Sequence, residues 1–310
     1  MTHTIRLGSR GSPLALAQTE LVQKLLGGDA HPIETFTTTG DRIQDRRLLD
    51  AGGKGLFTKE LDEALLDHRI DAAVHSMKDL PTKLPPGIVL CCVPAREDPR
   101  DAFISHKATN LMGLPQGAAV GTASLRRQAQ ALNLRPDLTI VTLRGSVQTR
   151  LKKLEDGSVD ATFLALAGLK RLGLEKHATG IIAEMDMPSA AGQGALAVTC
   201  REDDRDTRAA FAKISLPDFE IATACERAFL DALDGSCRTP IGALATIHGT
   251  SLHFIGEVLT PNGAKRWRSA EEISLGERPL EAARDLGRRL GQDIRAEAGS
   301  EFTPDTGAAW

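Results

Sequence analysis

Short strand-like segments alternate with helical patterns from the beginning of the chain to about residue 213, and this alternation limits the possible folds most strongly. Segments 4–7, 33–38 and 70–74 have the length and composition of strands. Ser12-Pro13 precedes a stripe of Leu and Ala at helical spacing, and residues 56–68 indicate a second helix. Such alternation is typical of βαβ units around mainly parallel sheets, so the first 213 residues are predicted to be α/β.

The pattern restarts at Asp101, which predicts a second α/β lobe. Strands are expected near 102–105, 118–121, 139–143 and 160–164, with helices beginning near Ser124 and Ser146. By analogy with two-lobed binding folds, a strand at 194–200 returns the chain to the first lobe. After residue 216 a helix at 219–233, strands at 241–247 and 251–259, and a helix at 279–297 indicate an α+β part. Three domains are predicted, at 1–98 with 194–216, 99–193, and 217–310.

The composition excludes several classes of protein. The 310 residues carry 38 Lys and Arg against 41 Asp and Glu, a formal net charge of -3, whereas general nucleic-acid binders usually carry a basic excess. No apolar run approaches the ~20 residues that span a bilayer, and no signal-peptide pattern is present, so we expect a cytoplasmic protein without a membrane partner. Five cysteines form no pair or Cys/His cluster at zinc spacing, so no metal site is expected.

Residues 74–79, Val-His-Ser-Met-Lys-Asp, place a hydroxyl, an ammonium and a carboxylate at the end of the strand predicted at 70–74. In open α/β sheets ligands bind outside the carboxyl ends of the strands, so Asp79 is expected to face a cleft. The alternative is that Ser76, Asp79 and Pro81 only build a turn. On this segment alone the two interpretations are equally good.

Basic residues beside Gly, Ser or Thr indicate sites for a small polyanion. They occur in segments 9–12, 52–55, 122–127 and 143–150. Turns of small residues and helix starts direct backbone N–H groups at anions, and Arg binds carboxylates with two parallel hydrogen bonds. A polycarboxylate ligand is the favoured interpretation for Arg126, Arg127, Arg144 and Arg150. Arg46, Arg47, Arg100 and the 201–208 group stand near acids and are interpreted as solvated or paired.

Cys237 differs from the other cysteines because it lies in a loop pattern beside Arg238. Cys91, Cys92, Cys200 and Cys225 fall in apolar strands or a helix and are interpreted as small core residues. A loop thiol beside a cation favours covalent chemistry. A Cys-dependent acyl transferase would need a base, for which only His75 is a candidate, and a histidine at a strand end is more often packed.

Taken together, these motifs resemble the porphobilinogen deaminase (hydroxymethylbilane synthase) family over essentially the whole length of the chain. Any one motif is weak, but all of them occurring in order is specific. The segments that match are 9–15, 52–60, 74–79, 96–101, 124–127, 143–150, 167–173, 192–194 and 235–237.

The resemblance implies an α/β fold with two lobes of type II periplasmic-binding-protein-like architecture plus a small α+β C-terminal domain. It also implies a transferase of tetrapyrrole (haem) biosynthesis that carries one dipyrromethane cofactor, thioether-linked to Cys237. Four porphobilinogen molecules are joined head to tail with loss of ammonia, and water then frees hydroxymethylbilane. The family members are monomers, which implies a monomer here.

Residue roles are carried over by position. Asp79 matches the catalytic aspartate. The cofactor-binding positions, besides Cys237 and Asp79, match Ser76, Lys78, Thr122, Ser124, Arg126, Arg127, Arg144 and Gly145. The substrate-binding positions match Arg10, Ser12, Lys54, Phe57, Arg144, Arg150, Arg171 and Gln193.

Two departures and two alternatives accompany the resemblance. Asp50 stands where some members have Lys, which leaves Lys54 and Lys59 as the cations near that loop, and Ser146 stands where some have Asn. The segment 40–55 is expected to be a mobile cover. A two-lobed solute-binding or sensor module for a polycarboxylate, and the acyl transferase, are the rival functions. Cys237 separates the first of them from an enzyme, because a pure binder needs no thiol in a third domain.

Overall fold

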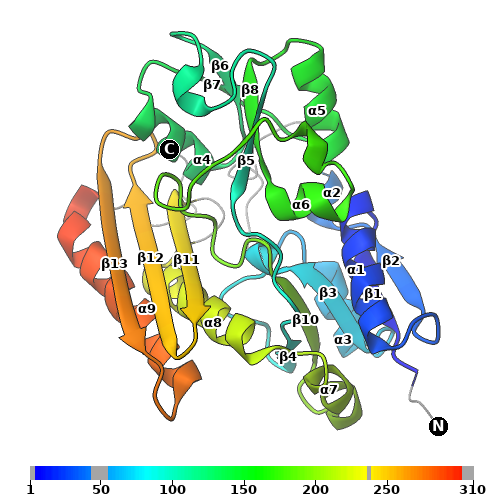
Figure 1. Cartoon of the computed structure of the whole chain (residues 1–310). Helices are drawn as coiled ribbons and strands as arrows, with labels where there is room; N and C mark the ends of the chain where they lie inside the picture. The colour runs from blue at the N-terminus through cyan, green and yellow to red at the C-terminus, as the bar shows by residue number, and fades with distance from the viewer. Residues whose placement is uncertain (1–3, 43–54, 236–238, 302–310) are drawn as a thin grey trace. The chain divides into compact units, whose positions relative to one another are not determined.

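The computed structural model describes residues 4–42, 55–235 and 239–301. By its internal contacts the chain forms two compact units. The first unit contains residues 1–97 and 194–220, and the second contains residues 98–193 and 221–310. Three sheets are present in the described residues, one in the first unit and two in the second (Figure 1).

The first unit is built on a five-stranded mixed sheet. Its strand order is β2-β1-β3-β10-β4, with β1 parallel to β2 and β3, and β10 antiparallel to both of its neighbours. The strands are β1 (Leu7–Arg10), β2 (Ile33–Phe36), β3 (Ala72–Ser76), β4 (Ile88–Cys92) and β10 (Leu196–Arg201). The helices are α1 (Pro13–Leu26), α2 (Thr39–Arg42), α3 (Lys59–Leu66) and α7 (Arg205–Ala212).

Helix α1 begins where the sequence pattern places it. Ser12 is the N-cap, its hydroxyl accepting a hydrogen bond from Ala15 N at 3.3 Å, and Pro13 is the first helical residue. Val22 of this helix packs with Leu7 and Val74 in the core of the sheet. Burial of this apolar stripe holds the carboxyl ends of β1 and β3 beside one another, which positions the residues that follow them.

The larger sheet of the second unit repeats the same pattern of parallel and antiparallel pairing, although its antiparallel strand comes first in the chain. The order is β7-β6-β8-β5-β9, with β6 parallel to β7 and β8, and β5 antiparallel to β8 and β9. The strands are β5 (Asp101–Ser105), β6 (Ala119–Gly121), β7 (Thr139–Val141), β8 (Ala161–Ala165) and β9 (Gly180–Ile181). The helices are α4 (Leu125–Leu134), α5 (Val147–Glu155) and α6 (Leu166–Arg171), with single turns at Leu111–Gly113 and Glu175–His177.

A three-stranded antiparallel sheet and two helices complete the second unit. The strands β11 (Ile241–His248), β12 (Ser251–Leu259) and β13 (Arg266–Ser274) pair in sequence order, and α8 (Pro217–Ala232) and α9 (Pro279–Ala298) pack on them (Figure 1). A last turn follows at Gly299–Glu301. Phe229 of α8 lies 5.1 Å from Phe254 of β12 between ring centroids. Gly287 of α9 lets the two helices touch, because a Cβ there would stand 2.1 Å from the Cys225 carbonyl oxygen.

These elements confirm the predicted fold class, with two α/β lobes and a small α+β part at the C-terminal end. Ser124 and Ser146 are the N-caps of α4 and α5, as predicted. The first strand is shifted, lying at Leu7–Arg10 instead of 4–7. Helix α7 and strand β13 were not predicted. The division into three domains stays a prediction.

Two of the arginines that were interpreted as solvated or paired with acids can be compared with the structure. Arg100 pairs with Asp98 at 2.6 Å, as expected of a residue beside acids. Arg201 is also paired with a neighbouring acid, Asp204, at 2.7 Å, but it is buried instead of lying at the surface, and it donates hydrogen bonds to the carbonyls of Leu65 and Ile70. The reason is that β10 lies inside the sheet, so its last side chain meets the α3–β3 connection instead of solvent.

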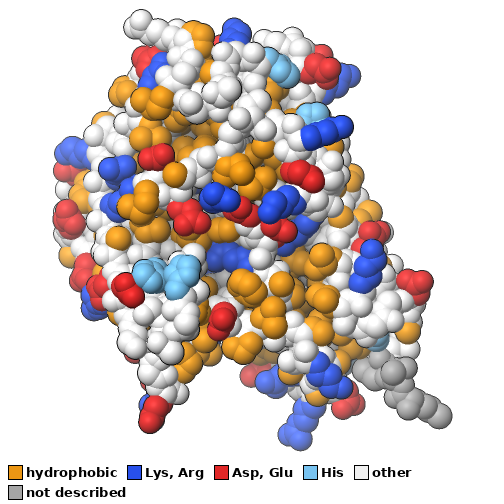
Figure 2. All heavy atoms as spheres, in the orientation of Figure 1, with side chains coloured by type: hydrophobic (Ala, Val, Ile, Leu, Met, Phe, Trp, Pro, Cys, Tyr) orange, Lys and Arg blue, Asp and Glu red, His pale blue; other side chains and the backbone are white. Residues whose placement is uncertain are grey.

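The described surface and interior agree with the composition. Figure 2 shows blue and red side chains interspersed over the visible face, in keeping with 38 basic and 41 acidic residues. Cys92, Cys200 and Cys225 are buried, as predicted, and burial raises the pKa of Cys92 to about 12.

Within the described ranges, no helix is both long and apolar enough to cross a membrane. No group of three potential metal ligands occurs among those residues either.

Candidate active site

The segment from Ser76 to Asp79 forms a turn and also presents a partly exposed carboxylate. Strand β3 ends at Ser76, and Met77–Asp79 form a single 3-10 turn. Met77 N donates to the Ala195 carbonyl at 3.0 Å, and the Met77 and Leu80 side chains are buried. These two anchors leave the intervening Asp79 side chain 30% exposed at the carboxyl end of the sheet. The two interpretations of the sequence are therefore compatible.

Arg10 lies at the end of the neighbouring parallel strand β1 and contacts Asp79. Its Nη1 is 3.7 Å from Asp79 Oδ2, while its Nε donates to Asp41 Oδ2 at 3.1 Å. The guanidinium also lies over the Phe57 ring, with 4.3 Å between Cζ and the centroid. Although burial opposes the charge, the hydrogen bond that Arg10 donates to Asp41 and the charge of Asp79 raise the pKa of Arg10 above its ordinary value.

Two further polar residues support this end of the sheet. Ser76 Oγ exchanges hydrogen bonds with the Gln18 amide of α1, at 2.9 and 3.1 Å. His75 is buried, and its Nε2 lies 3.2 Å from Thr199 Oγ1. Burial and the charge of Arg10 lower the pKa of His75 to about 4, so the ring is neutral and packed at physiological pH. This arrangement favours the packed interpretation of His75 over a catalytic base.

In the second unit, the connection from β6 to α4 places two consecutive arginines in the first turn of a helix. Ser124 Oγ accepts from Arg127 N at 3.4 Å, and Thr122 Oγ1 accepts from Ser124 N at 3.1 Å. The predicted N-cap therefore fixes where α4 begins. Arg126 and Arg127 are both buried as a result.

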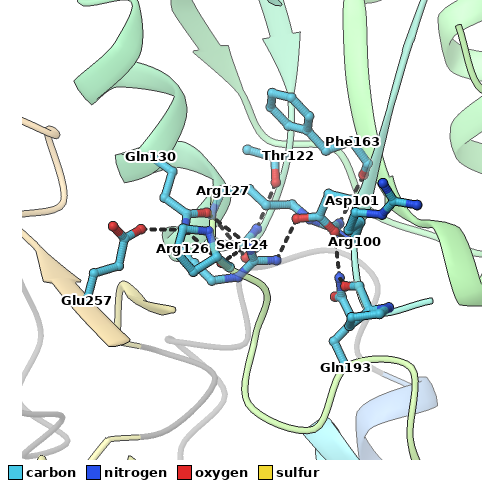
Figure 3. A network of polar contacts seen from close by, with 12 residues as sticks. Arg100, Asp101, Thr122, Ser124, Arg126, Arg127, Gln130, Phe163, Gln193 and Glu257 are labelled. Atoms are coloured by element: carbon cyan, nitrogen blue, oxygen red, sulfur yellow. Dashed lines mark hydrogen bonds and ion pairs between the residues drawn. The ribbon is translucent and has the colours of Figure 1, made fainter. Parts of the chain in front are cut away.

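Both arginines converge on Asp101, the first residue of β5, as Figure 3 shows. Asp101 is fully buried and accepts from Arg126 Nη2 at 2.8 Å and Arg127 Nη2 at 2.7 Å. Gln193 Nε2 donates to the same carboxylate at 2.8 Å. Burial disfavours the charge of Asp101, but the two guanidiniums outweigh it and lower the pKa of this carboxyl. Sequence reasoning missed Asp101, because a lone Asp at a strand start carries no signal of its partners.

Arg150 adds a third cation close to this pair. It lies in α5, where its Nε donates to the Gly145 carbonyl at 2.9 Å. Burial and the nearby charges of Arg127 and Arg144 lower the pKa of Arg150 to about 10. Gly145 adopts a φ of 116°, a conformation that favours glycine, so this residue carries the backbone turn between Arg144 and α5.

These residues fit a ligand that carries several carboxylates. Asp101 is one negative charge against the two positive charges of Arg126 and Arg127, and Arg144 and Arg150 are close enough to interact with this group. The Nε atoms of Arg126 and Arg127 are buried and have no hydrogen-bond partner among the described residues. Because buried donors are normally satisfied, the two atoms mark places where a carboxylate would be accommodated.

The remaining predicted residues are placed as follows. Lys78 is half-buried beside Asp79, and Arg171 ends α6. Gln193 is buried, with its amide nitrogen also donating to the Pro99 carbonyl at 2.6 Å. Cys237, Lys54 and most of the 40–55 segment lie outside the described residues, so the attachment cysteine and the cover stay predictions. Asp41, the partner of Arg10, was not predicted, although it lies in the polar segment singled out as functional.

Fold and site together define an α/β protein with one exposed carboxylate at a strand end and a buried arginine cluster suited to a polycarboxylate. The family model for the porphobilinogen deaminase dipyromethane cofactor binding domain matches residues 5–209, and that for the porphobilinogen deaminase C-terminal domain matches residues 221–296. The chain belongs to the porphobilinogen deaminase family. The predicted family, enzyme class and dipyrromethane cofactor are thereby confirmed.

Relatives of high identity agree with this membership. The chain is 51% identical to a porphobilinogen deaminase from Phenylobacterium zucineum, over 95% of this chain and 97% of the relative. It is 52% identical to one from Caulobacter vibrioides, over 95% and 96%. Among solved structures, it is similar to a nutrient binding protein from Burkholderia cenocepacia bound to methionine, with 16% identity, 70% and 94% coverage, and a TM-score of 0.42. That last similarity is too low to bear on function, and the solute-binding alternative is not favoured.

Proposed function

We propose that Asp79 is the catalytic carboxylate of porphobilinogen condensation and that Cys237 carries the dipyrromethane. The observation that carries the proposal is the pairing of Asp79 with Arg10 at the carboxyl ends of adjacent parallel strands. A partly exposed carboxylate that makes only a long contact to a cation can still accept hydrogen bonds from a ligand. The family reaction requires such a group, because positive charge develops when an aminomethyl group loses ammonia.

When bound, the dipyrromethane would supply the pyrrole carbon to which the first porphobilinogen is joined, and each later porphobilinogen would join the ring added before it. Asp79 accepts hydrogen bonds from pyrrole N–H groups and stabilises the positive charge as the carbon–nitrogen bond breaks. The same carboxylate is placed to take up the proton lost from the coupling carbon. Four condensations release four molecules of ammonia, and water then frees hydroxymethylbilane. Thioether formation at Cys237 also releases ammonia. The sulfur forms a bond to the aminomethyl carbon of porphobilinogen, and the amino group leaves together with the thiol proton.

Arg126 and Arg127 are proposed to bind the acetate and propionate chains of the dipyrromethane, together with Thr122, Ser124, Arg144, Gly145, Ser76 and Lys78. Their unpartnered Nε donors support this assignment. The substrate and growing chain are assigned to Arg10, Ser12, Lys54, Phe57, Arg144, Arg150 and Arg171. Gln193 is assigned to the substrate by position, and a second role is proposed for it. Because its amide nitrogen donates to Asp101 and Pro99, we propose that it holds Asp101 in place.

We also propose that the protein is a cytoplasmic monomer that binds neither nucleic acid nor membrane. The near balance of basic and acidic residues supports the first exclusion. Light scattering coupled to size-exclusion chromatography would test the monomer, for which a mass near 33.1 kDa is expected.

Intact mass spectrometry tests the proposed chemistry directly. Protein purified from cells should carry the added mass of two linked pyrroles, and the Cys237→Ser variant should lack it. Brief exposure to porphobilinogen should then add mass in steps of one pyrrole unit. A wild-type protein at its bare sequence mass, or a Cys237→Ser variant that retains the added mass, would contradict the assignment of Cys237.

A further inference from the structure

Arg126 is held by more than Asp101. Its Nη1 donates to Gln130 Oε1 at 2.8 Å and to the Pro188 carbonyl at 3.0 Å. Gln130 lies one turn further along α4, as Figure 3 shows. The guanidinium is therefore fixed from two directions, by Asp101 on β5 and by Gln130 on its own helix.

The orientation of the Gln130 amide is set by its other neighbours. Gln130 Nε2 donates to Glu257 Oε1 at 2.7 Å and to the Pro188 carbonyl at 2.8 Å. A carboxylate and a carbonyl only accept hydrogen bonds, so the NH₂ side of the amide must face them. The amide oxygen is then directed at Arg126. Glu257 and the Pro188 carbonyl together disfavour the flipped amide, which would place donor against donor at Arg126.

Glu257 lies in the C-terminal sheet, far from Arg126 in the sequence. It is fully buried on β12, and its second oxygen accepts from Arg268 Nε at 2.8 Å across the β12–β13 pair. On its other side it is paired with Gly242 of β11. A Cβ at Gly242 would stand 3.1 Å from Gln130 Nε2 and 3.2 Å from Glu257 Cγ, so this glycine leaves room for the contact.

We propose that Glu257 is a positioning residue for the cofactor, acting on Arg126 through the Gln130 amide. Strand β11 begins at Ile241, four residues after Cys237. One small sheet therefore follows the covalent attachment residue directly and also orients the arginine assigned to the carboxylates of the same cofactor. The inference rests on the proposed role of Arg126.

The rate at which apoprotein takes up the cofactor tests this inference. Apoprotein made in cells that cannot make porphobilinogen would be mixed with porphobilinogen, and the gain of two pyrrole units followed by intact mass. Glu257→Leu should load at least tenfold more slowly than wild type. Glu257→Gln keeps an oxygen that accepts from Gln130 and should recover most of the rate, although both variants lose the Arg268 ion pair.

A matched control separates positioning from simple docking of the C-terminal sheet. Gln128 also lies on α4 and donates to the Pro261 carbonyl at 3.1 Å, but it does not contact Arg126 in the described contacts. Gln128→Ala should load at the wild-type rate. If Glu257→Leu fails to fold, Gln130→Met tests the same link, since it leaves the Glu257–Arg268 pair intact and should load equally slowly.

The outcomes are distinguishable. Wild-type loading by Glu257→Leu, or equal slowing by Gln128→Ala and Glu257→Leu, would overturn the positioning role. Arg126→Leu is the test of the underlying assignment, because its loading at the wild-type rate would show that the proposed role of Arg126 is wrong. The melting temperature of each apoprotein, measured alongside, should not follow the loading rates across the series.

Discussion

The Arg10 guanidinium is shared between two carboxylates, with Nη1 3.7 Å from Asp79 Oδ2 and Nε 3.1 Å from Asp41 Oδ2. Asp41 makes the close hydrogen-bonded pair, and Asp79 makes only the longer contact. Arg10 is thus anchored by Asp41 and leaves the oxygens of Asp79 open to other donors. A carboxylate whose oxygens already accepted close hydrogen bonds from an arginine would be a poorer acceptor for pyrrole N–H groups.

Asp79→Asn should lower the turnover of porphobilinogen by about 10²- to 10⁴-fold, the range expected when a charged or proton-transferring group is lost. The melting temperature should change little, because a partly exposed ion pair contributes about 0–1 kcal/mol. Steady-state kinetics and calorimetry check both parts. Asp41→Asn is the informative comparison. If it lowered turnover as much as Asp79→Asn, the role of Asp79 would lie in holding Arg10.

Arg150→Ala should raise the KM for porphobilinogen by about 10- to 100-fold, since a hydrogen bond to a charged group contributes about 1.5–3 kcal/mol. It should not lower the free energy of unfolding. The charges of Arg127 and Arg144 already oppose that of Arg150, as its pKa of about 10 indicates. Lys152→Ala removes the same charge from an exposed position on α5 and should alter neither quantity. A large loss of stability in Arg150→Ala would show that this arginine is mainly structural.

His75 should make the protein less stable in mild acid. Its folded-state pKa is about 4, below the value of about 6.5 in an unfolded chain. Between these two values the unfolded chain binds a proton that the folded state excludes, so stability is complete above pH 6.5 and falls toward pH 4. The expected loss is about 3 kcal/mol. Urea unfolding of wild type and His75→Gln at pH 7 and pH 4.5 measures how much stability each protein loses in acid. The loss should be smaller in the variant.

The same variant addresses the acyl-transferase alternative. His75→Gln should retain most of its porphobilinogen turnover at pH 8, whereas a catalytic base would be indispensable. His248 is exposed, so His248→Gln serves as the control and should leave the turnover at pH 8 unchanged.

Gly287→Ala should destabilise the protein by about 1–3 kcal/mol, the usual range for overpacking. On a free helix this substitution would be favourable by about 1 kcal/mol. Here the substitution is expected to lower the free energy of unfolding instead, because the new Cβ would lie 2.1 Å from the backbone oxygen of Cys225. Gly276→Ala, with open space around it, should have little effect on urea unfolding. Equal free energies of unfolding for the two variants would mean that α8 and α9 can move apart without a loss of stability.

The elements with a local signature were predictable from the sequence, and those defined by distant partners were not. A serine whose hydroxyl can cap a helix indicates where the helix begins. This signal predicted three helix starts, and Ser12, Ser124 and Ser146 are N-caps in the structure. Strand β13 is half exposed and rich in charge, so its apolar content is too low to indicate a strand. Arg201 looked like a surface residue because burial depends on β10 lying between β3 and β4.

The candidate site follows the same rule. Asp79 and the arginines were found from motifs, whereas Asp101 and Glu257 were not. Both acids are buried, and each acts through residues at least 25 positions away in the sequence. The partner of a buried charge is chosen by the fold, so a single sequence offers no spacing from which to infer it.

The position of strand β10 in its sheet affects the order in which parts of the chain can fold during synthesis. It lies between β3 and β4, yet it follows them by about one hundred residues, after the whole of the second lobe's sheet. During synthesis, the strand that ends next to Asp79 has no partner on one edge until residues 196–201 have emerged. The sheet of residues 101–181 has all its strands by then. The sheet that carries the arginine cluster can therefore finish folding first on the ribosome, and the sheet that carries Asp79 is completed by the returning chain.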